Sequence, residues 1–132
     1  MNNKTILLVD DDVSQLDLIE ILFESEGFNV QQAISGKVAI NYLTDNRPDA
    51  IIIDLMMPNM SGAEAIKKIR DDSITCPIIA FTAVDDLESH QEAIDAGCNL
   101  ILTKPCKPAE LVKEVSKFLV RAVINWYFYC KP

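Results

Sequence analysis

The sequence predicts an α/β domain in which helices cover both faces of a five-stranded parallel sheet. Two observations support this prediction. Short, apolar, β-branched segments alternate five times with longer segments of helical period. Several of the short segments are apolar almost throughout, which is typical of strands buried on both faces. Strand–helix–strand units of this length require right-handed crossovers and therefore parallel strands.

The expected strands are Thr5–Val9, Asn29–Ala33, Ala50–Asp54, Pro77–Phe81 and Leu100–Leu102. The sequence around them carries the breaks that such strands need. Pro48 and Pro77 introduce the third and fourth strands, and proline commonly marks a turn or the start of an extended segment. Each strand is followed by polar residues or by a short turn before the next helix begins.

The expected helices are Ser14–Ser25, Gly36–Leu43, Gly62–Arg70, Leu87–Ala96 and Pro108–Ile124. Apolar residues recur every three or four positions in each, as one buried helix face requires. In the fourth helix this face is expected to comprise Leu87, Ala93 and Ile94. Gly27 and Gly97 stand where two of the helices should end, because glycine readily adopts the left-handed backbone of a helix terminus.

Length and charge limit the kind of protein. The 132 residues are expected to form one domain over 1–132, and the net charge of -8 argues against nucleic acid and anionic membranes as partners. No apolar run approaches the roughly 20 residues of a membrane span. No export signal is visible, and four cysteines lack the C-x-x-C spacing of a metal or redox site. We therefore expect a cytoplasmic protein with reduced thiols.

Polar residues gather where the expected strands end. They are Asp10, Asp11 and Asp12 after the first strand, Asp54 at the end of the third, Thr82 after the fourth and Lys104 after the fifth. Ligands of open α/β sheets bind beyond these strand ends. Converging carboxylates repel each other unless they hold a proton or a cation, and Mg²⁺ is the natural choice. A carboxylate can also accept a phosphoryl group, with a lysine to neutralise it.

This pattern resembles the response-regulator receiver family. The matching segments are Leu7–Asp12, Ile52–Pro58 with Gly62, Phe81–Ala83, and Gly97 with Leu102–Pro105. The resemblance extends to about Leu119 and is specific only as a combination. It implies a doubly wound, flavodoxin-like sheet of strand order 2-1-3-4-5 with five helices in three layers. It also implies a chemotaxis-type, single-domain regulator in a two-component phosphorelay.

The resemblance implies a role for each residue at the strand ends. Asp54 would be the phosphoacceptor, and Thr82 and Lys104 would contact the phosphoryl oxygens. The implied ligands of Mg²⁺ are Asp10, Asp11, Asp54 and the backbone carbonyl of Met56. The donor would be a phosphohistidine of a sensor histidine kinase or a histidine phosphotransfer protein. The output would be binding to a downstream protein, and the domain would catalyse only its own phosphorylation and dephosphorylation.

Two departures from the family pattern bear on the output. Ile101 stands where many members carry an aromatic residue that rotates during signalling, so another movement is expected here. Met56 and Val84 stand two residues beyond Asp54 and Thr82, and neither side chain can hold an attacking water. Slow self-dephosphorylation is therefore expected.

Residues 120–132 are expected to be an apolar extension of the last helix. Trp126, Tyr127 and Phe128 lie close together there, and exposed aromatic patches usually mark interfaces. We expect a homodimer or partner contact through this tail and the last helix. The alternative is that the tail folds back on its own domain.

Two other functions compete with the receiver interpretation. Asp10 and Asp12 match the D-x-D motif of haloacid-dehalogenase-like phosphatases, but Lys104 follows Asp85-Asp86 where that family needs it before an acidic pair. Asp12 could instead cap the following helix. The second alternative is a receiver-like binding module that is never phosphorylated. Ile101 favours it slightly, whereas the intact strand-end residues oppose it.

Overall fold

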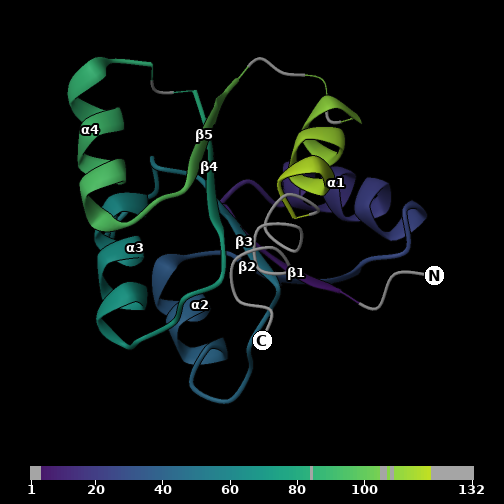
Figure 1. Ribbon diagram of the computed structural model, residues 1–132, viewed down its shortest axis with the longest axis horizontal. Helices are drawn as coiled ribbons and strands as arrows, with labels where there is room; N and C mark the ends of the chain where they lie inside the picture. Colours follow the sequence, from purple (N-terminus) through teal and green to yellow (C-terminus); the bar gives the residue numbers. More distant parts are fainter. Residues whose placement is uncertain (1–3, 84, 105–106, 108, 120–132) are drawn as a thin grey trace, which may run out of the picture.

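The computed structural model describes residues 4–83, 85–104, 107 and 109–119. Its five strands are β1 (Thr5–Val9), β2 (Asn29–Ala33), β3 (Ala50–Ile53), β4 (Ile78–Thr82) and β5 (Leu100–Thr103). All neighbouring strands are parallel, and their order across the sheet is β2-β1-β3-β4-β5. This order confirms the doubly wound, flavodoxin-like sheet (Figure 1).

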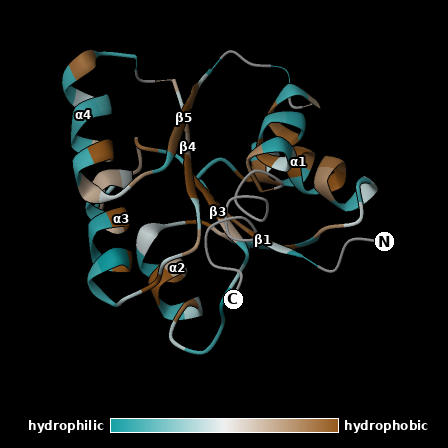
Figure 2. Cartoon of the chain, viewed as in Figure 1, coloured by the Kyte–Doolittle hydropathy of each residue, from teal (hydrophilic) through white to brown (hydrophobic). Residues whose placement is uncertain are grey.

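The helices flank the sheet in two layers. They are α1 (Val13–Ser25), α2 (Gly36–Tyr42), α3 (Gly62–Asp71), α4 (Leu87–Ala96) and a last helix over 109–119. In Figure 1, α1 and the last helix lie on one side of the sheet, and the other three lie on the opposite side. The ribbon coloured by hydropathy shows mostly hydrophobic central strands between helices in which hydrophobic and hydrophilic segments alternate (Figure 2).

Alternate residues of each strand enter two separate cores. In β1, Leu7 and Val9 face the core under α2, α3 and α4, whereas Ile6 and Leu8 face the core under α1 and the last helix. Such alternation follows from the two-residue period of a β-strand. The strands are therefore buried on both faces, which explains why they lack polar alternation in the sequence.

Short polar side chains start the helices. Asp12, Ser35, Ser61 and Asp86 each accept a hydrogen bond from a backbone N–H in the first turn, which satisfies a donor that the helix leaves without a partner. Gly27 and Gly97 have φ angles of 91° and 118°, as expected of glycines at helix ends. The bounds of the other elements agree with the expected ones to about a residue, whereas the expected end of the last helix at Ile124 lies outside the described residues. Residues 120–132, including the proposed aromatic extension, lie outside the described ranges.

The expected apolar face of α4 is wrong in part. Leu87 is 83% exposed and Ile94 is 52% exposed, whereas Ala93 is fully buried. The small side chains of Ala93 and Ala96 pack against the core, and this close approach leaves the two larger side chains outside.

The described ranges contain neither a helix that could span a membrane nor a disulfide. No helix there has the length and apolar character needed to cross a bilayer. Cys76 and Cys98 are free thiols, and burial raises the pKa of both, which keeps them protonated. Cys106 and Cys130 lie outside these ranges.

Candidate metal and phosphoryl site

The register of the sheet brings two of the acids together. Val9 lies opposite Ile53 in the β1–β3 pair, so the chain leaves the two strands at Asp10 and Asp54. The Asp54 N–H donates to the Val9 carbonyl over 3.0 Å, and the Asp10 N–H donates to the Ala33 carbonyl over 3.1 Å. Backbone hydrogen bonds therefore fix the Cα positions of both acids at the carboxyl edge of the sheet.

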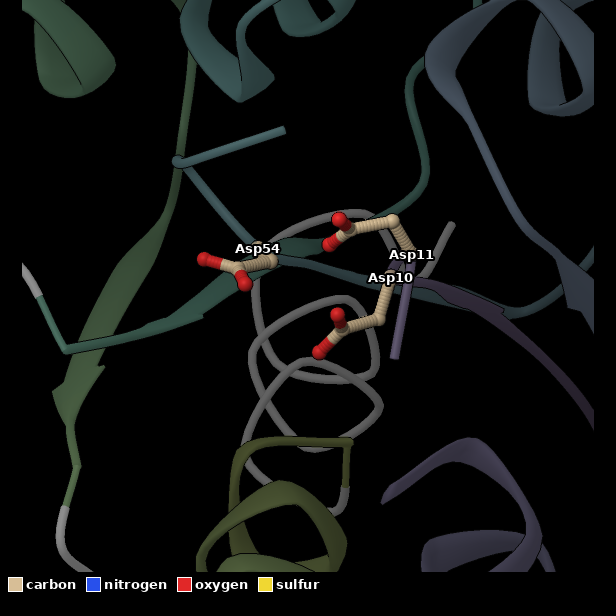
Figure 3. Close-up of side chains that lie close together, drawn as sticks. All are labelled: Asp10, Asp11 and Asp54. Atoms are coloured by element: carbon tan, nitrogen blue, oxygen red, sulfur yellow. The ribbon is translucent and has the colours of Figure 1, made fainter. Parts of the chain in front are cut away.

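Three carboxylates converge at this edge. Asp10, Asp11 and Asp54 each offer one oxygen, and these oxygens lie within 4.8 Å of one another. Figure 3 shows Asp10 and Asp11 side by side after β1, with Asp54 across from them. Asp10 is only 6% exposed, and the Asp54 side chain is 11% exposed. Asp11 is exposed, so the cluster opens to solvent on its side.

Lys104 reaches the same site from β5. Its backbone N–H donates to the Thr82 carbonyl over 2.8 Å, which continues the β4–β5 pairing by one residue. Its Nζ lies 3.4 Å from Asp10 Oδ2 and 3.5 Å from Asp54 Oδ2, so the ammonium bridges the two acids. Thr82 is fully buried as the last residue of β4.

The electrostatics of the cluster explain why a cation would bind. Burial raises the pKa of Asp10, and the neighbouring charge of Asp54 raises it further. The Asp12 N–H, 3.0 Å from Asp10 Oδ1, and the Lys104 ammonium act in the opposite direction. Because burial is the largest of these effects, the Asp10 carboxylate is under-compensated, and a further positive charge would stabilise it.

A close approach of α3 shapes the loop that carries Asp54. The Gly62 N–H donates to the Leu55 carbonyl over 3.0 Å, and Asp54 Oδ1 accepts from the Met56 N–H over 3.1 Å. A Cβ at position 62 would lie 2.4 Å from the Asp54 carbonyl oxygen, well inside van der Waals contact. Gly62 was recognised in the sequence only as part of a motif, and the motif gave no sign of this steric role.

The structure settles how two other expected residues behave. Asp12 caps α1 by accepting from the Gln15 N–H over 3.2 Å, and it is absent from the acid cluster found among the described residues. These contacts support the capping role of Asp12 and not its role in a D-x-D motif. Ile101 packs half-buried against the core under α2, α3 and α4. Val84 lies outside the described residues.

The donor set matches a hard cation. Three carboxylates offer oxygens within reach of one ion, and oxygen is the ligand atom that Mg²⁺ prefers. The described part of the site presents no imidazole or thiolate among these ligands, so a softer metal has no advantage here.

Fold and site together define the class: a domain that positions acids, a hydroxyl and a lysine at the carboxyl edge of a doubly wound sheet. The family model described as the response regulator receiver domain matches residues 6–116. The chain therefore belongs to this family, whose members are receiver domains of two-component response regulators. Such domains are typically signalling domains and not enzymes.

Individual relatives agree with this assignment. The chain is 33% identical over 122 residues to the Bacillus subtilis alkaline phosphatase synthesis transcriptional regulatory protein PhoP, covering 92% of this chain and 51% of PhoP. It is 38% identical over 115 residues to an uncharacterized 14.6 kDa protein of Leptolyngbya boryana, covering 86% and 88%. The chain thus spans about half the length of PhoP and nearly all of the second relative.

Solved structures show the same fold. The receiver domain of a Francisella response regulator superposes with a TM-score of 0.83 at 33% identity, covering 91% of this chain and 99% of that one. Because nearly all of that receiver domain is covered at this TM-score, the two chains share one fold.

Proposed function

We propose that this domain accepts a phosphoryl group on Asp54 in a Mg²⁺-dependent reaction and thereby switches its binding to another protein. One observation carries the proposal. Two buried acids from neighbouring strands share a lysine ammonium at 3.4 and 3.5 Å, beside a third, exposed acid. Phosphoryl transfer needs mainly positioning and charge neutralisation, and this arrangement supplies both.

The residues divide into a nucleophile and groups that compensate charge. An Asp54 carboxylate oxygen would bond to phosphorus as the P–N bond of the donor phosphohistidine breaks, and the imidazole would leave with that electron pair. Lys104 and the Thr82 hydroxyl would contact the phosphoryl oxygens. Asp10, Asp11, Asp54 and the Met56 carbonyl would hold the ion, and bound Mg²⁺ would neutralise charge on the phosphoryl group.

Membership of the receiver family suggests the phosphoryl donor and the binding partner of this domain. The donor would be a sensor histidine kinase or a histidine phosphotransfer protein in the cytoplasm, and the product would bind a downstream protein. Catalysis would be limited to the domain's own phosphorylation and dephosphorylation. The acidic net charge of -8 argues against direct contact of this chain with nucleic acid or anionic membrane.

Phosphorylation by a small donor tests the proposal directly. The protein is incubated with acetyl phosphate, with and without Mg²⁺, and its intact mass is measured. We expect one phosphoryl group to be incorporated only with Mg²⁺, and none in Asp54→Ala. Asp12→Asn is the matched control, because Asp12 lies in the same loop as the cluster but caps α1. Full incorporation in Asp54→Ala would refute the assignment, as would the absence of incorporation in the unaltered protein.

We propose in addition that the tail at 120–132 and the last helix form a homodimer contact. The support is the run of Trp126, Tyr127 and Phe128, which follows a helix whose Leu119 is already buried in the core. A chain ending at Val120 should elute as a smaller species than the full chain in size-exclusion chromatography. An apparent mass that falls only by the mass of the missing residues would contradict the proposed homodimer.

A further inference from the structure

Phe81 lies next to the phosphoacceptor position, although nothing in its chemistry marks it as a site residue. It precedes Thr82 in β4 and is 4% exposed. The β3–β4 register places Ile53 opposite Ala80, so the next residue of each strand is Asp54 in one and Phe81 in the other. The β1–β3 register continues the same row to Asp10.

The alternation of the strands also places Lys104 on the side of the sheet that holds Phe81. Phe81 lies opposite Leu102 in the β4–β5 register, and both side chains contact the core under α1 and the last helix. Lys104 follows Leu102 by two residues, which is one full period of a strand. Its Nζ lies 5.3 Å from the centroid of the Phe81 ring. This distance is within the range in which an aromatic face attracts a cation.

The ring and the two acids attract the Lys104 ammonium differently once a cation binds the acids. Asp10 and Asp54 lie 3.4 and 3.5 Å from the ammonium, near the long limit of a hydrogen bond, so neither holds it tightly. When a cation binds these acids, part of their charge is compensated, and their pull on Lys104 weakens. The Phe81 ring carries no oxygen that could coordinate the cation, so its attraction for the ammonium stays the same.

We propose that Phe81 is a positioning residue whose ring holds the Lys104 ammonium over the gap between Asp10 and Asp54 while ligands occupy the acids. The ring would touch no phosphoryl oxygen and would act only through Lys104. This inference rests on the proposed phosphorylation of Asp54. It predicts that weakening the electrostatics of the ring impairs binding of a phosphoryl-like ligand and spares binding of the metal.

Stepwise fluorination of the ring tests this proposal while keeping the size of the side chain. Phenylalanine with two or four ring fluorines is incorporated at position 81 alone, and the affinities for Mg²⁺ and for beryllofluoride plus Mg²⁺ are measured by calorimetry. Each step should lower the beryllofluoride affinity, by about tenfold in total, because fluorine withdraws the negative charge from the ring face. The affinity for Mg²⁺ alone should change by less than about twofold, since the metal ligands are carboxylates.

Two controls separate positioning from packing. In a Lys104→Met background, the fluorinated rings should have no further effect on beryllofluoride affinity, because the interaction they weaken is already gone. Phe28→Leu is compared with Phe81→Leu, because both phenylalanines are buried in the same core, at 6% and 4% exposure. Only Phe81→Leu should lower beryllofluoride affinity.

Each outcome either supports or overturns the proposed role of Phe81. A flat response to fluorination in a protein that binds beryllofluoride would overturn the role of the ring alone. Equal losses for Mg²⁺ and beryllofluoride, or losses that persist in Lys104→Met, would reduce Phe81 to a packing residue. A protein whose unaltered form binds no beryllofluoride would overturn the proposed function together with this inference.

Discussion

Two cations, Lys104 and Arg70, sit at opposite edges of the sheet and are held in opposite ways. Lys104 lies at the carboxyl edge, where its ammonium faces two carboxylates at 3.4 and 3.5 Å. Arg70 lies near the end of α3, beside the loops that lead into β4 and β5. Its guanidinium contacts neutral carbonyl groups and no carboxylate among its described hydrogen bonds.

The Arg70 site is nearly saturated with short hydrogen bonds. Its Nε donates to the Gly97 carbonyl over 3.1 Å. Its Nη1 donates to the Ile74 and Cys76 carbonyls over 2.8 Å each, and its Nη2 donates to Asn99 Oδ1 over 2.8 Å. One planar guanidinium thus fastens α3 to the loops before β4 and β5, a geometry that lysine cannot reproduce.

The contrast between the Arg70 and Lys104 sites shows which of the two can still bind a ligand. At the Arg70 edge, short bonds satisfy both the donors and the carbonyl groups, so the arrangement stabilises the fold and leaves little to exchange. At the Lys104 edge, the contacts are long, and burial raises the pKa of Asp10, so the acids still gain from another positive charge.

The largest expected effect is that of Lys104→Met. Without the ammonium, beryllofluoride affinity should fall at least about a hundredfold, because a charge-neutralising contact to the phosphoryl position is lost. Mg²⁺ affinity should rise a few-fold, since a like charge has been removed from beside the ion. Calorimetry measures both. Arg70→Met should leave both affinities unchanged in the folded protein, and a comparable loss there would erase the distinction between the two edges.

Arg70→Met should have the largest effect on stability. It leaves three backbone carbonyls without their donor, and the expected loss is about 3 kcal/mol in the free energy of unfolding. Urea unfolding followed by circular dichroism measures it. Arg70→Lys should recover less than half of the loss, because one ammonium cannot reach all four acceptors at once. Full recovery by lysine would show that charge alone matters there.

The sequence predicted the carboxyl edge far better than the Arg70 edge, for a physical reason. Strand ends are readable from apolar runs, so acids that follow them can be assigned to a common edge. Asp10 and Asp54 were found in this way, and the fold shown by the relatives agrees. Arg70 was noted only as the end of a helix, because its acceptors are backbone carbonyls, and a carbonyl has no signature in the sequence.

Other misses arise because contacts between segments cannot be predicted from each segment alone. Leu87 and Ile94 fitted a helical apolar stripe, but the depth to which a helix face is buried depends on its neighbours and not on its own pattern. From the sequence, Phe81 was assigned only to the end of a strand and to a motif, because its cation–π contact depends on the register between β4 and β5. Long-range register is set by packing across the sheet, and the separate segments do not reveal it.

Gly62→Ala should perturb the carboxyl edge through the backbone. The new Cβ would lie 2.4 Å from the Asp54 carbonyl oxygen and 2.6 Å from Leu55 Cα, so α3 or the Asp54 loop must move. We expect a loss of about 2 kcal/mol in unfolding free energy and slower phosphorylation by acetyl phosphate. Gly36→Ala is the matched control, because its closest contact would be the flexible Met60 Sδ at 2.8 Å. An equal cost at both glycines would contradict the steric argument.

The smallest expected effect is on the pH dependence of stability, and it tests whether the acid pocket is under-compensated when no metal is bound. Because burial raises the folded-state pKa of Asp10 above its ordinary 3.8, the folded protein binds the proton more tightly than the unfolded chain does. Stability without Mg²⁺ should therefore fall as pH rises through this pKa, and the cost is fully present at pH values above it.

Asp10→Asn removes this cost. Without Mg²⁺ it should unfold at a slightly higher temperature than the unaltered protein at neutral pH, and the difference should vanish below the ordinary pKa of 3.8, where Asp10 is protonated in both states. Adding Mg²⁺ should reverse the order, because only the unaltered protein keeps all three carboxylates. Thermal unfolding at several pH values, with Mg²⁺ or a chelator, measures this. If Asp10→Asn were less stable at neutral pH with the chelator, Lys104 would already compensate the pocket, and the two edges of the sheet would differ less than their geometry indicates.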